Sequence, residues 1–358
     1  MASSFKRFDH FSKVLNGSPV YIGLDVHKRT YSVALFNSTD GLIETYTCPA
    51  DVQGLVKQFL NFDFTISGIA YETGPTGFGL ARALDKAGFR VVVAAGSRIP
   101  RGAAASAKSD RIDAVKLAQY LSAGLLKSVA IPTVEEEGYR ALVRRRKRVS
   151  EIRAKCKQRI KGLLLVLGVE EPLSLTSWTK RAEGDLMALE LECFNKQAIA
   201  STVRELKFLT DELAILDIEI SKATAKLHDE PFNRLKSVPG VGNIAASTFL
   251  SEVFNPKRFK RAEEVTSYLG LAPIVSRSGD GPARAKLRPV GQRRLRGLLI
   301  EAAWQWTWRD EEAKELYNHH YTKSGISQKA ICAVARKLAI KLWKLAVDQS
   351  PVPSGAVM

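Results

Sequence analysis

The sequence has few cysteines and no long apolar segment. Its 358 residues include four cysteines, Cys48, Cys156, Cys193 and Cys332, and none of them forms a CxxC pair. Such spacing favours neither a disulfide framework nor a zinc site. No apolar run approaches the ~20 residues that a transmembrane helix needs. The first 18 residues are too polar for a signal peptide. We therefore expect a cytoplasmic protein with no membrane partner.

Acidic residues are also scarce relative to basic ones. The chain has 37 Asp and Glu against 54 Lys and Arg, so its formal net charge is +17. A strongly basic chain favours a polyanionic partner, and nucleic acid is the commonest one. A basic enzyme of another kind remains an alternative. The length is sufficient for two domains joined by a helical connector.

The first third of the chain alternates between strand and helix patterns. Two β-rich apolar runs, 20–24 and 31–36, flank a polar break and predict a hairpin. The remaining expected elements are strands at 41–47, 64–71 and 89–95 and helices at 52–60, 76–87 and 110–121. Three strands followed by alternating helices and strands predict an α/β domain with a mixed five-stranded sheet.

Four carboxylates stand at the ends of these expected elements. Asp25 ends the first strand and Glu72 ends the fourth, and these strands could be neighbours. Asp110 and Asp113 are three residues apart and share one helix face. Each acid alone is explained by a turn, a helix cap or an exposed position. Together they would repel one another without a cation, and oxygen ligands suit Mg²⁺ or Mn²⁺. This pattern favours a metal site for phosphoryl transfer.

A basic segment follows. From Arg140 to Lys161 there are 11 Lys and Arg and one acid, which predicts a long basic helix that contacts phosphate backbones. A solvated helix face is the alternative. The densest cluster is Arg144, Arg145, Arg146, Lys147 and Arg148. A loop is expected at 172–180. Leucines and isoleucines from Leu206 to Leu227 then form a heptad seam, which fits an intramolecular helix pair or a dimer equally well.

The last third begins with a glycine turn. Residues 237–247 contain Gly240 and Gly242 at the start of a helix, and the segment resembles a helix-hairpin-helix element whose backbone N–H groups suit a phosphate. A polar, flexible loop at 274–284 follows, and a helix begins at Arg293. The candidate nucleic-acid contacts in this part are Gly240, Gly242, Arg284, Arg293 and Arg294.

Four segments carry a family resemblance. They are Tyr-Ile-Gly-Leu-Asp25-Val-His-Lys, Tyr-Glu72-Thr-Gly, Lys-Ser-Asp110-Arg-Ile-Asp113-Ala and Leu-Ala-Pro-Ile-Val-Ser-Arg-Ser278-Gly. These segments are similar to the signatures of the DEDD-type insertion-sequence transposases, which act as bridge-RNA-guided DNA recombinases. The resemblance covers nearly the whole chain, from about Tyr21 to Trp343.

The resemblance implies a three-part organisation. An RNase H-like (RuvC-like) DEDD catalytic domain is expected at 19–128, as in Holliday-junction resolvases. A basic and coiled-coil connector is expected at 129–230. A mainly α-helical C-terminal transposase domain with the helix-hairpin-helix-like element is expected at 231–348. The connector of the family is a coiled coil, which favours self-association.

The resemblance also implies site roles and partners. Asp25, Glu72, Asp110 and Asp113 would be the catalytic metal-binding tetrad for Mg²⁺ or Mn²⁺. Ser278, rather than Ser276, would be the nucleophile that forms a phosphoserine link to DNA. The implied partners are donor DNA, target DNA, a structured noncoding bridge RNA and further copies of the chain, as a dimer or as a tetramer in the synaptic complex. The tetrad and the serine of one site would come from different protomers. The protein would lie in a bacterial cytoplasm, and at the nucleoid when DNA is bound.

Three other functions compete. A RuvC-like structure-specific nuclease would use the tetrad with water as nucleophile and would not need Ser278. A sugar-kinase-like or actin-like ATPase could use Gly23 to Asp25 as a phosphate hairpin, but no further glycine-rich phosphate or adenosine loop follows. A nucleic-acid-binding protein with an inactive site is opposed by the presence of all four acids.

Overall fold

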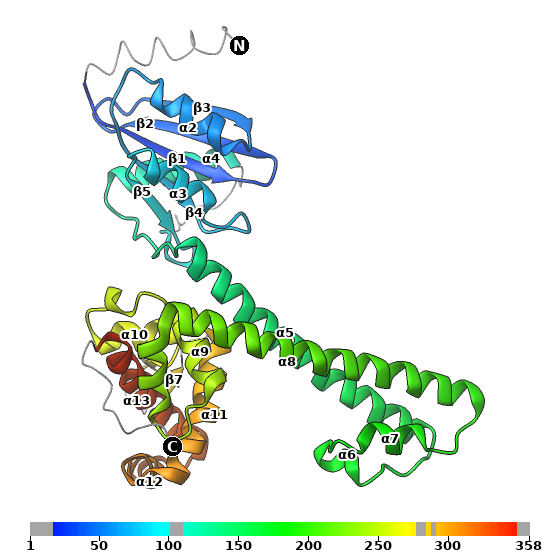
Figure 1. Ribbon diagram of the computed structural model, residues 1–358. Coiled ribbons are helices and arrows are strands. Elements are labelled where there is room, and N and C mark those ends of the chain that lie inside the picture. Colours follow the sequence, from blue (N-terminus) through cyan, green and yellow to red (C-terminus); the bar gives the residue numbers. More distant parts are fainter. Residues whose placement is uncertain (1–16, 101–109, 277–283, 288–290, 349–358) are drawn as a thin grey trace. The chain divides into compact units, whose positions relative to one another are not determined.

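A computed structural model describes residues 17–100, 110–276, 284–287 and 291–348. The chain divides into two compact units, Met1–Pro132 and Thr133–Met358 (Figure 1). Within the described residues, no helix combines the length and the apolar character needed to cross a membrane.

The first unit is built on a mixed five-stranded sheet. Its strands are β1 (Val20–Val26), β2 (Thr30–Asn37), β3 (Ile43–Pro49), β4 (Ile66–Glu72) and β5 (Val91–Ala94). Their order in the sheet is β3-β2-β1-β4-β5. The pairs β1–β2 and β2–β3 are antiparallel, whereas β1–β4 and β4–β5 are parallel. This is the arrangement of the RNase H-like fold, so the predicted fold class is confirmed.

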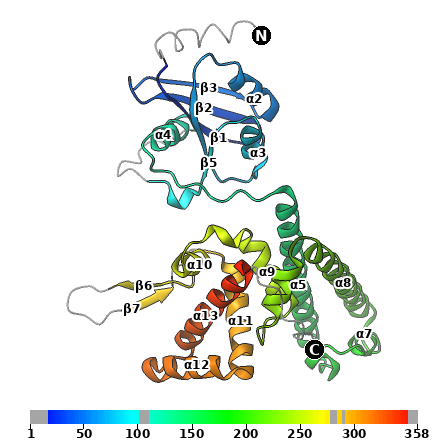
Figure 2. The ribbon, with the colours of Figure 1, turned by 60° about the vertical axis from the view of Figure 1, so that its left-hand side comes forward.

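Helices cover both faces of this sheet (Figure 2). Helices α2 (Val52–Leu60) and α3 (Gly79–Lys86) pack on one face, against buried residues of β1 and β4 such as Ile22 and Ile69. Helix α4 (Asp110–Ser122) covers the other face, where its Leu117 and Leu121 meet Ala70. Because side chains alternate along a strand, Gly23 and Asp25 belong to the face that α4 covers. A 3-10 turn, η1 (Gly96–Arg98), follows β5.

The second unit begins with two long helices. Helix α5 (Val134–Val166) starts with a capping box, in which Thr133 and Glu136 exchange hydrogen bonds. Helix α8 (Cys193–Lys236) contains a non-helical residue at His228, shortly before Pro231. Two short helices, α6 (Ser174–Ser177) and α7 (Ala182–Met187), lie between them in the chain. The loop predicted at 172–180 is therefore partly helical.

The heptad seam of α8 is buried inside the chain. Leu209, Leu213 and Leu216 form one cluster with Val149 and Cys156 of α5. An intramolecular helix pair therefore accounts for these seam positions, as the first alternative had it. The prediction of self-association is then supported by the family resemblance and not by the seam.

The remaining helices form a compact bundle. They are α9 (Asn243–Val253), α10 (Ala262–Leu269), α11 (Arg293–Arg309), α12 (Glu311–Ser324) and α13 (Ser327–Val347), with a 3-10 turn η2 (Pro256–Arg258). Fully buried Trp306 lies in the core of this bundle. Tyr139 and Val143 of α5 belong to the same core. The basic helix and the C-terminal helices are therefore parts of one packed body.

The polar loop predicted at 274–284 has paired ends. Strands β6 (Pro273–Ser276) and β7 (Arg284–Leu287) form an antiparallel hairpin (Figure 2). The expectation of a loop across this whole range is therefore wrong for its first and last residues. Residues 277–283 lie outside the described part of the chain.

A buried ion pair links α5 to α9. The Arg144 guanidinium donates two hydrogen bonds to Glu252, with Nε–Oε1 and Nη2–Oε2 distances of 2.8 and 2.7 Å. The Glu252 side chain is 1% exposed. Tyr268 donates to the Glu252 carbonyl oxygen, and Arg140 donates to that of Ser251. A carboxylate buried this deeply requires such a partner, because its desolvation is otherwise uncompensated.

Removal of Arg144 should destabilise the second unit. Arg144→Ala leaves a buried carboxylate unpaired, and we expect a loss of about 3–5 kcal/mol in unfolding free energy. Urea unfolding followed by tryptophan fluorescence measures this, because all five tryptophans lie in residues 133–358. Arg148→Ala, on the exposed side of the same helix, is the control and should cost less than about 0.5 kcal/mol. Equal losses in the two variants would contradict a special role for the pair.

Candidate active site

Asp25 and Glu72 stand at adjacent strand ends. Strands β1 and β4 run parallel, with Leu24 paired to Tyr71, so the next residue of each strand is an acid. Both strands end at this edge of the sheet, and parallel strands present their carboxyl ends together. The predicted proximity of strands one and four is therefore present in the sheet.

A glycine lets α4 reach the same edge. A Cβ atom at Gly23 would overlap the carbonyl oxygen of Ala114, and it would lie 2.6 Å from the backbone nitrogen of Ala118. Helix α4 therefore lies directly against β1 with no side chain between them. Its first turn contains Asp110 and Asp113, which favourably face the positive end of the helix dipole. The close approach places this turn beside Asp25.

His27 joins this group. Its Nε2 atom lies 3.1 Å from Asp25 Oδ2 and 3.3 Å from Asp110 Oδ2. One ligand atom from each of Asp25, His27 and Asp110 falls within 4.8 Å of the others. Sequence reasoning did not include His27 among the site residues. The available signal was its position two residues after Asp25, directly after the end of β1.

The electrostatics around Asp25 oppose its ionised form. Its side chain is 23% exposed. Burial raises the pKa of the Asp25 carboxyl above its ordinary value, while His27 lowers it and the charges of Asp110 and Asp113 raise it further. A cation placed among these groups would favour the ionised form of Asp25 and reduce the repulsion between the carboxylates.

The donor set fits a divalent cation. Two carboxylate oxygens and one imidazole nitrogen within bonding reach of a common point are ligands that Mn²⁺ and Mg²⁺ accept, with imidazole more suited to the former. Asp113 acts on Asp25 through its charge. The Glu72 side chain lies against Gly96, where an added Cβ atom would overlap Glu72 Oε1. All four predicted acids therefore belong to one end of the first unit, but the closest trio includes His27.

The predicted nucleophile cannot be placed in this site. Ser278 lies outside the described residues, between the paired strands β6 and β7 of the second unit. Ser276 is the last residue of β6. The assignment of Ser278 rather than Ser276 therefore remains a prediction.

Most of the basic cluster on α5 has acidic partners within the second unit. Arg144 pairs with Glu252, as described above, and Arg146 makes two hydrogen bonds with Asp217 at 2.7 and 3.2 Å. The weaker pairs are Arg145 with Glu212 and Lys147 with Glu151, both at 3.9 Å. Three of these four acids come from α8 and α9, which sequence analysis of one segment did not consider. The cations available to a phosphate backbone are therefore fewer than predicted.

Other predicted contacts remain exposed. Arg293 and Arg294 lie in the first turn of α11, and both are exposed with no ion pair within the described residues. Two cations at a helix N-terminus oppose the helix dipole, so they do not stabilise the helix. Gly240 and Gly242 form the turn between α8 and α9, as predicted. Arg284 begins β7.

Comparison with known proteins gives consistent matches. Residues 22–168 match a DEDD transposase family of the IS110 type, and residues 232–318 match the Transposase IS116/IS110/IS902 family. The chain is 29% identical to a putative transposase (y4qE) of Sinorhizobium fredii over 356 residues, covering 91% of this chain and 88% of the relative. It is 26% identical to the transposase for insertion sequence element IS1533 of Leptospira borgpetersenii, covering 91% and 95%. The transposase for element IS1111A of Coxiella burnetii is 28% identical, with 70% of each chain covered.

Replacement of Asp25 should stabilise the first unit in a pH-dependent way. The raised pKa means that folding is penalised once the carboxyl ionises. Below the ordinary aspartate pKa, about 3.9, the carboxyl is protonated in both states and the penalty vanishes. Asp25→Asn, measured in EDTA, should therefore raise the melting temperature near neutral pH, with a gain that disappears as the pH falls below that value.

The measurement follows circular dichroism and selects the transition without a tryptophan signal, since the first unit contains no tryptophan. Asp85→Asn, at an exposed position of α3, is the control. A gain that grows toward acid pH would contradict the assigned direction of the pKa shift.

Proposed function

Because the chain belongs to the DEDD-type insertion-sequence transposases, we propose that it exchanges DNA strands through a covalent phosphoserine intermediate. Transposases of insertion sequences cut and join DNA, so the chain is a DNA-processing enzyme. The finer proposal concerns which group attacks the phosphorus and how the energy of the phosphoester bond is retained. Its alternative is a RuvC-like nuclease that uses water.

The carrying observation is the convergence of acids at one end of the RNase H-like unit. Asp25, on β1, is brought beside the first turn of α4 by the contact at Gly23, and Glu72 ends the neighbouring strand. These side chains and His27 would hold Mg²⁺ or Mn²⁺. A bound divalent ion polarises a phosphoryl oxygen and stabilises the charge that develops on it. The acids would thereby hold the ion where it can bind the scissile phosphate beside the nucleophile.

Ser278 supplies the nucleophile in this proposal. Its Oγ attacks the phosphorus, the new Oγ–P bond replaces a P–O bond of the strand, and the departing DNA oxygen takes up a proton. The hydroxyl of a second strand then attacks the same phosphorus and releases the serine. Each step exchanges one phosphoester for another, so no nucleotide cofactor is required. The support for Ser278 is its position in the family signature.

Further partners follow from the same family membership. We propose a structured noncoding bridge RNA that pairs with donor and target DNA, and a dimer or tetramer in which one protomer's tetrad acts with another's serine. The net charge of +17 supports polyanionic partners in general. Among the basic residues, the exposed pair Arg293 and Arg294 is better suited to phosphate contact than Arg144, which is held by Glu252.

Ser278→Ala should separate the recombinase from the nuclease. If Ser278 is the nucleophile, denaturing a stalled reaction leaves protein attached to a DNA end, and the variant yields neither this adduct nor exchange products. Metal and DNA binding should persist, because Asp25 and the basic residues are unchanged. Gel analysis after denaturation measures the adduct, and Ser276→Ala is the matched control. A Ser278→Ala protein that still cuts and leaves free 5′-phosphates would establish water as the nucleophile.

The exposed arginines should dominate the salt dependence of duplex binding. Each lost phosphate contact reduces the slope of log K against log salt by about 0.9, so Arg293→Gln with Arg294→Gln should reduce it by about 2. The comparison pair Arg145→Gln and Arg146→Gln should change it less, because Glu212 and Asp217 already neutralise these cations. Fluorescence anisotropy over a salt series measures both. A larger change in the comparison pair would show that α5 is the main phosphate contact.

A further inference from the structure

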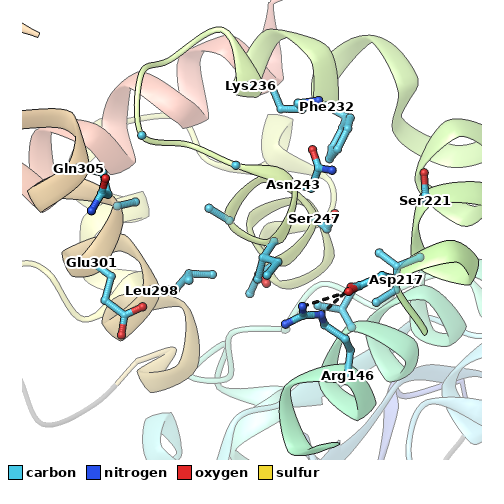
Figure 3. Close-up of a pocket in the computed structure, with 18 residues that line it drawn as sticks. Arg146, Asp217, Ser221, Phe232, Lys236, Asn243, Ser247, Leu298, Glu301 and Gln305 are labelled. Atoms are coloured by element: carbon cyan, nitrogen blue, oxygen red, sulfur yellow. Dashed lines mark hydrogen bonds and ion pairs between the residues drawn. The ribbon is translucent and has the colours of Figure 1, made fainter. Parts of the chain in front are cut away.

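The second unit contains a cavity that the proposed chemistry does not use. It has a volume of about 740 Å³ and is lined by residues of α5, α8, α9 and α11. Figure 3 shows Glu301 and Gln305 on α11 at one side and Lys236, Phe232 and Asn243 away from them. Cavities of a few hundred Å³ with a small number of convergent polar groups are typical of small-ligand sites.

One end of the cavity is suited to a phosphate. The first hydrogen bond of α9 runs from the Ala246 N–H to the Gly242 carbonyl, so the preceding three N–H groups have no acceptor in the helix. Gly242 provides no side-chain cap. The Lys236 ammonium lies 5.4 Å from the centre of the Phe232 ring and has no carboxylate partner within the described residues. A cation beside a helix N-terminus binds anions.

The other end is suited to a hydrogen-bond donor. Glu301 is exposed in the cavity and has no ion pair within the described part of the chain. Gln305, one turn later on α11, adds an amide. A carboxylate so placed repels a phosphate and accepts from N–H groups, such as those on the pairing edges of cytosine and guanine. The remaining charges, Arg146 and Asp217, neutralise each other in a two-bonded pair.

Close packing between the α8–α9 turn and α11 fixes the positions of the two ends of the cavity. Gly240 has a φ of +86°, and an added Cβ atom would lie 2.8 Å from Gln305 Cβ and from the Trp306 nitrogen. The α8–α9 turn is therefore packed directly on α11. Thr248, 8% exposed, lines the cavity between them. Phe232 lines the cavity at the end that holds Lys236.

From these features we infer that the cavity binds one unpaired nucleotide of a nucleic-acid strand. The phosphate lies at the N-terminus of α9 beside Lys236, and the base is directed to Glu301 and Gln305. This inference rests on the proposed function, because it assumes a nucleic-acid substrate or guide. It adds a base-reading site in the second unit, separate from the acids of the first.

A substitution at Glu301 tests the inference through the sign of its effect. Removing a negative charge strengthens the binding of a polyanion when no base contact exists. If Glu301 accepts from a base, Glu301→Gln should instead weaken binding of a short single-stranded oligonucleotide about tenfold, within the discrimination of one good base contact. The same variant should leave unchanged, or tighten, the binding of an abasic strand of equal length. Lys236→Gln should weaken both strands.

The measurement is anisotropy at low salt in EDTA with the full chain, using DNA and RNA versions of each strand. Glu315→Gln on α12 and Lys207→Gln on α8, both exposed and outside the cavity, are the matched controls. The expected pattern with either DNA or RNA supports the inference and identifies the strand that is bound. Equal or tighter binding of Glu301→Gln to every strand, or unchanged binding of Lys236→Gln, overturns it. Because no catalysis is measured, this result is independent of whether Ser278 forms an adduct.

Discussion

The active end of the first unit depends on a backbone contact at Gly23. Helix α4 rests on β1 without an intervening side chain, because any Cβ atom at this position would overlap Ala114. This contact brings Asp110 within reach of His27 and Asp25. The energetic consequence is unfavourable to folding, since burial raises the pKa of the Asp25 carboxyl and the nearby charges of Asp110 and Asp113 raise it further. A site that is destabilised in this way is typical of chemistry that needs a cation.

In the second unit, most of the clustered cations are paired with acids. The basic helix α5 is neutralised along one side by acids of α8 and α9, and the deepest of these, Glu252, is held by two hydrogen bonds from Arg144. The basic cluster therefore contributes to the packing of three helices. Among the described residues, further charges without an ion pair are Arg293 and Arg294 at the start of α11 and Lys236 and Glu301, which line the cavity. Surfaces of this kind are where a nucleic acid gains most, because no internal pair is broken on binding.

Much of the fold was predictable because its signals are local. Short apolar, β-rich runs predicted all five strands of the sheet, and helix α2 has the predicted bounds of 52–60. The short helix α6 and the β6–β7 hairpin were missed, because their segments have few apolar residues and are stabilised by pairing or by neighbours. The site acids were predicted from their positions at element ends. His27 was not, because a lone histidine gains meaning only when a second element supplies Asp110.

The sequence by itself determined most of the helices and strands of the first unit, where the acids stand on them and that the chain carries excess positive charge. Only the tertiary structure decided which charges remain available. The sequence around an arginine on α5 does not show whether its side chain faces solvent or pairs with Glu252, which lies more than a hundred residues away. The same holds for the seam of α8, whose spacing fits any partner helix. Long-range packing selects α5, because Val149 and Cys156 present the apolar surface that the leucines bury.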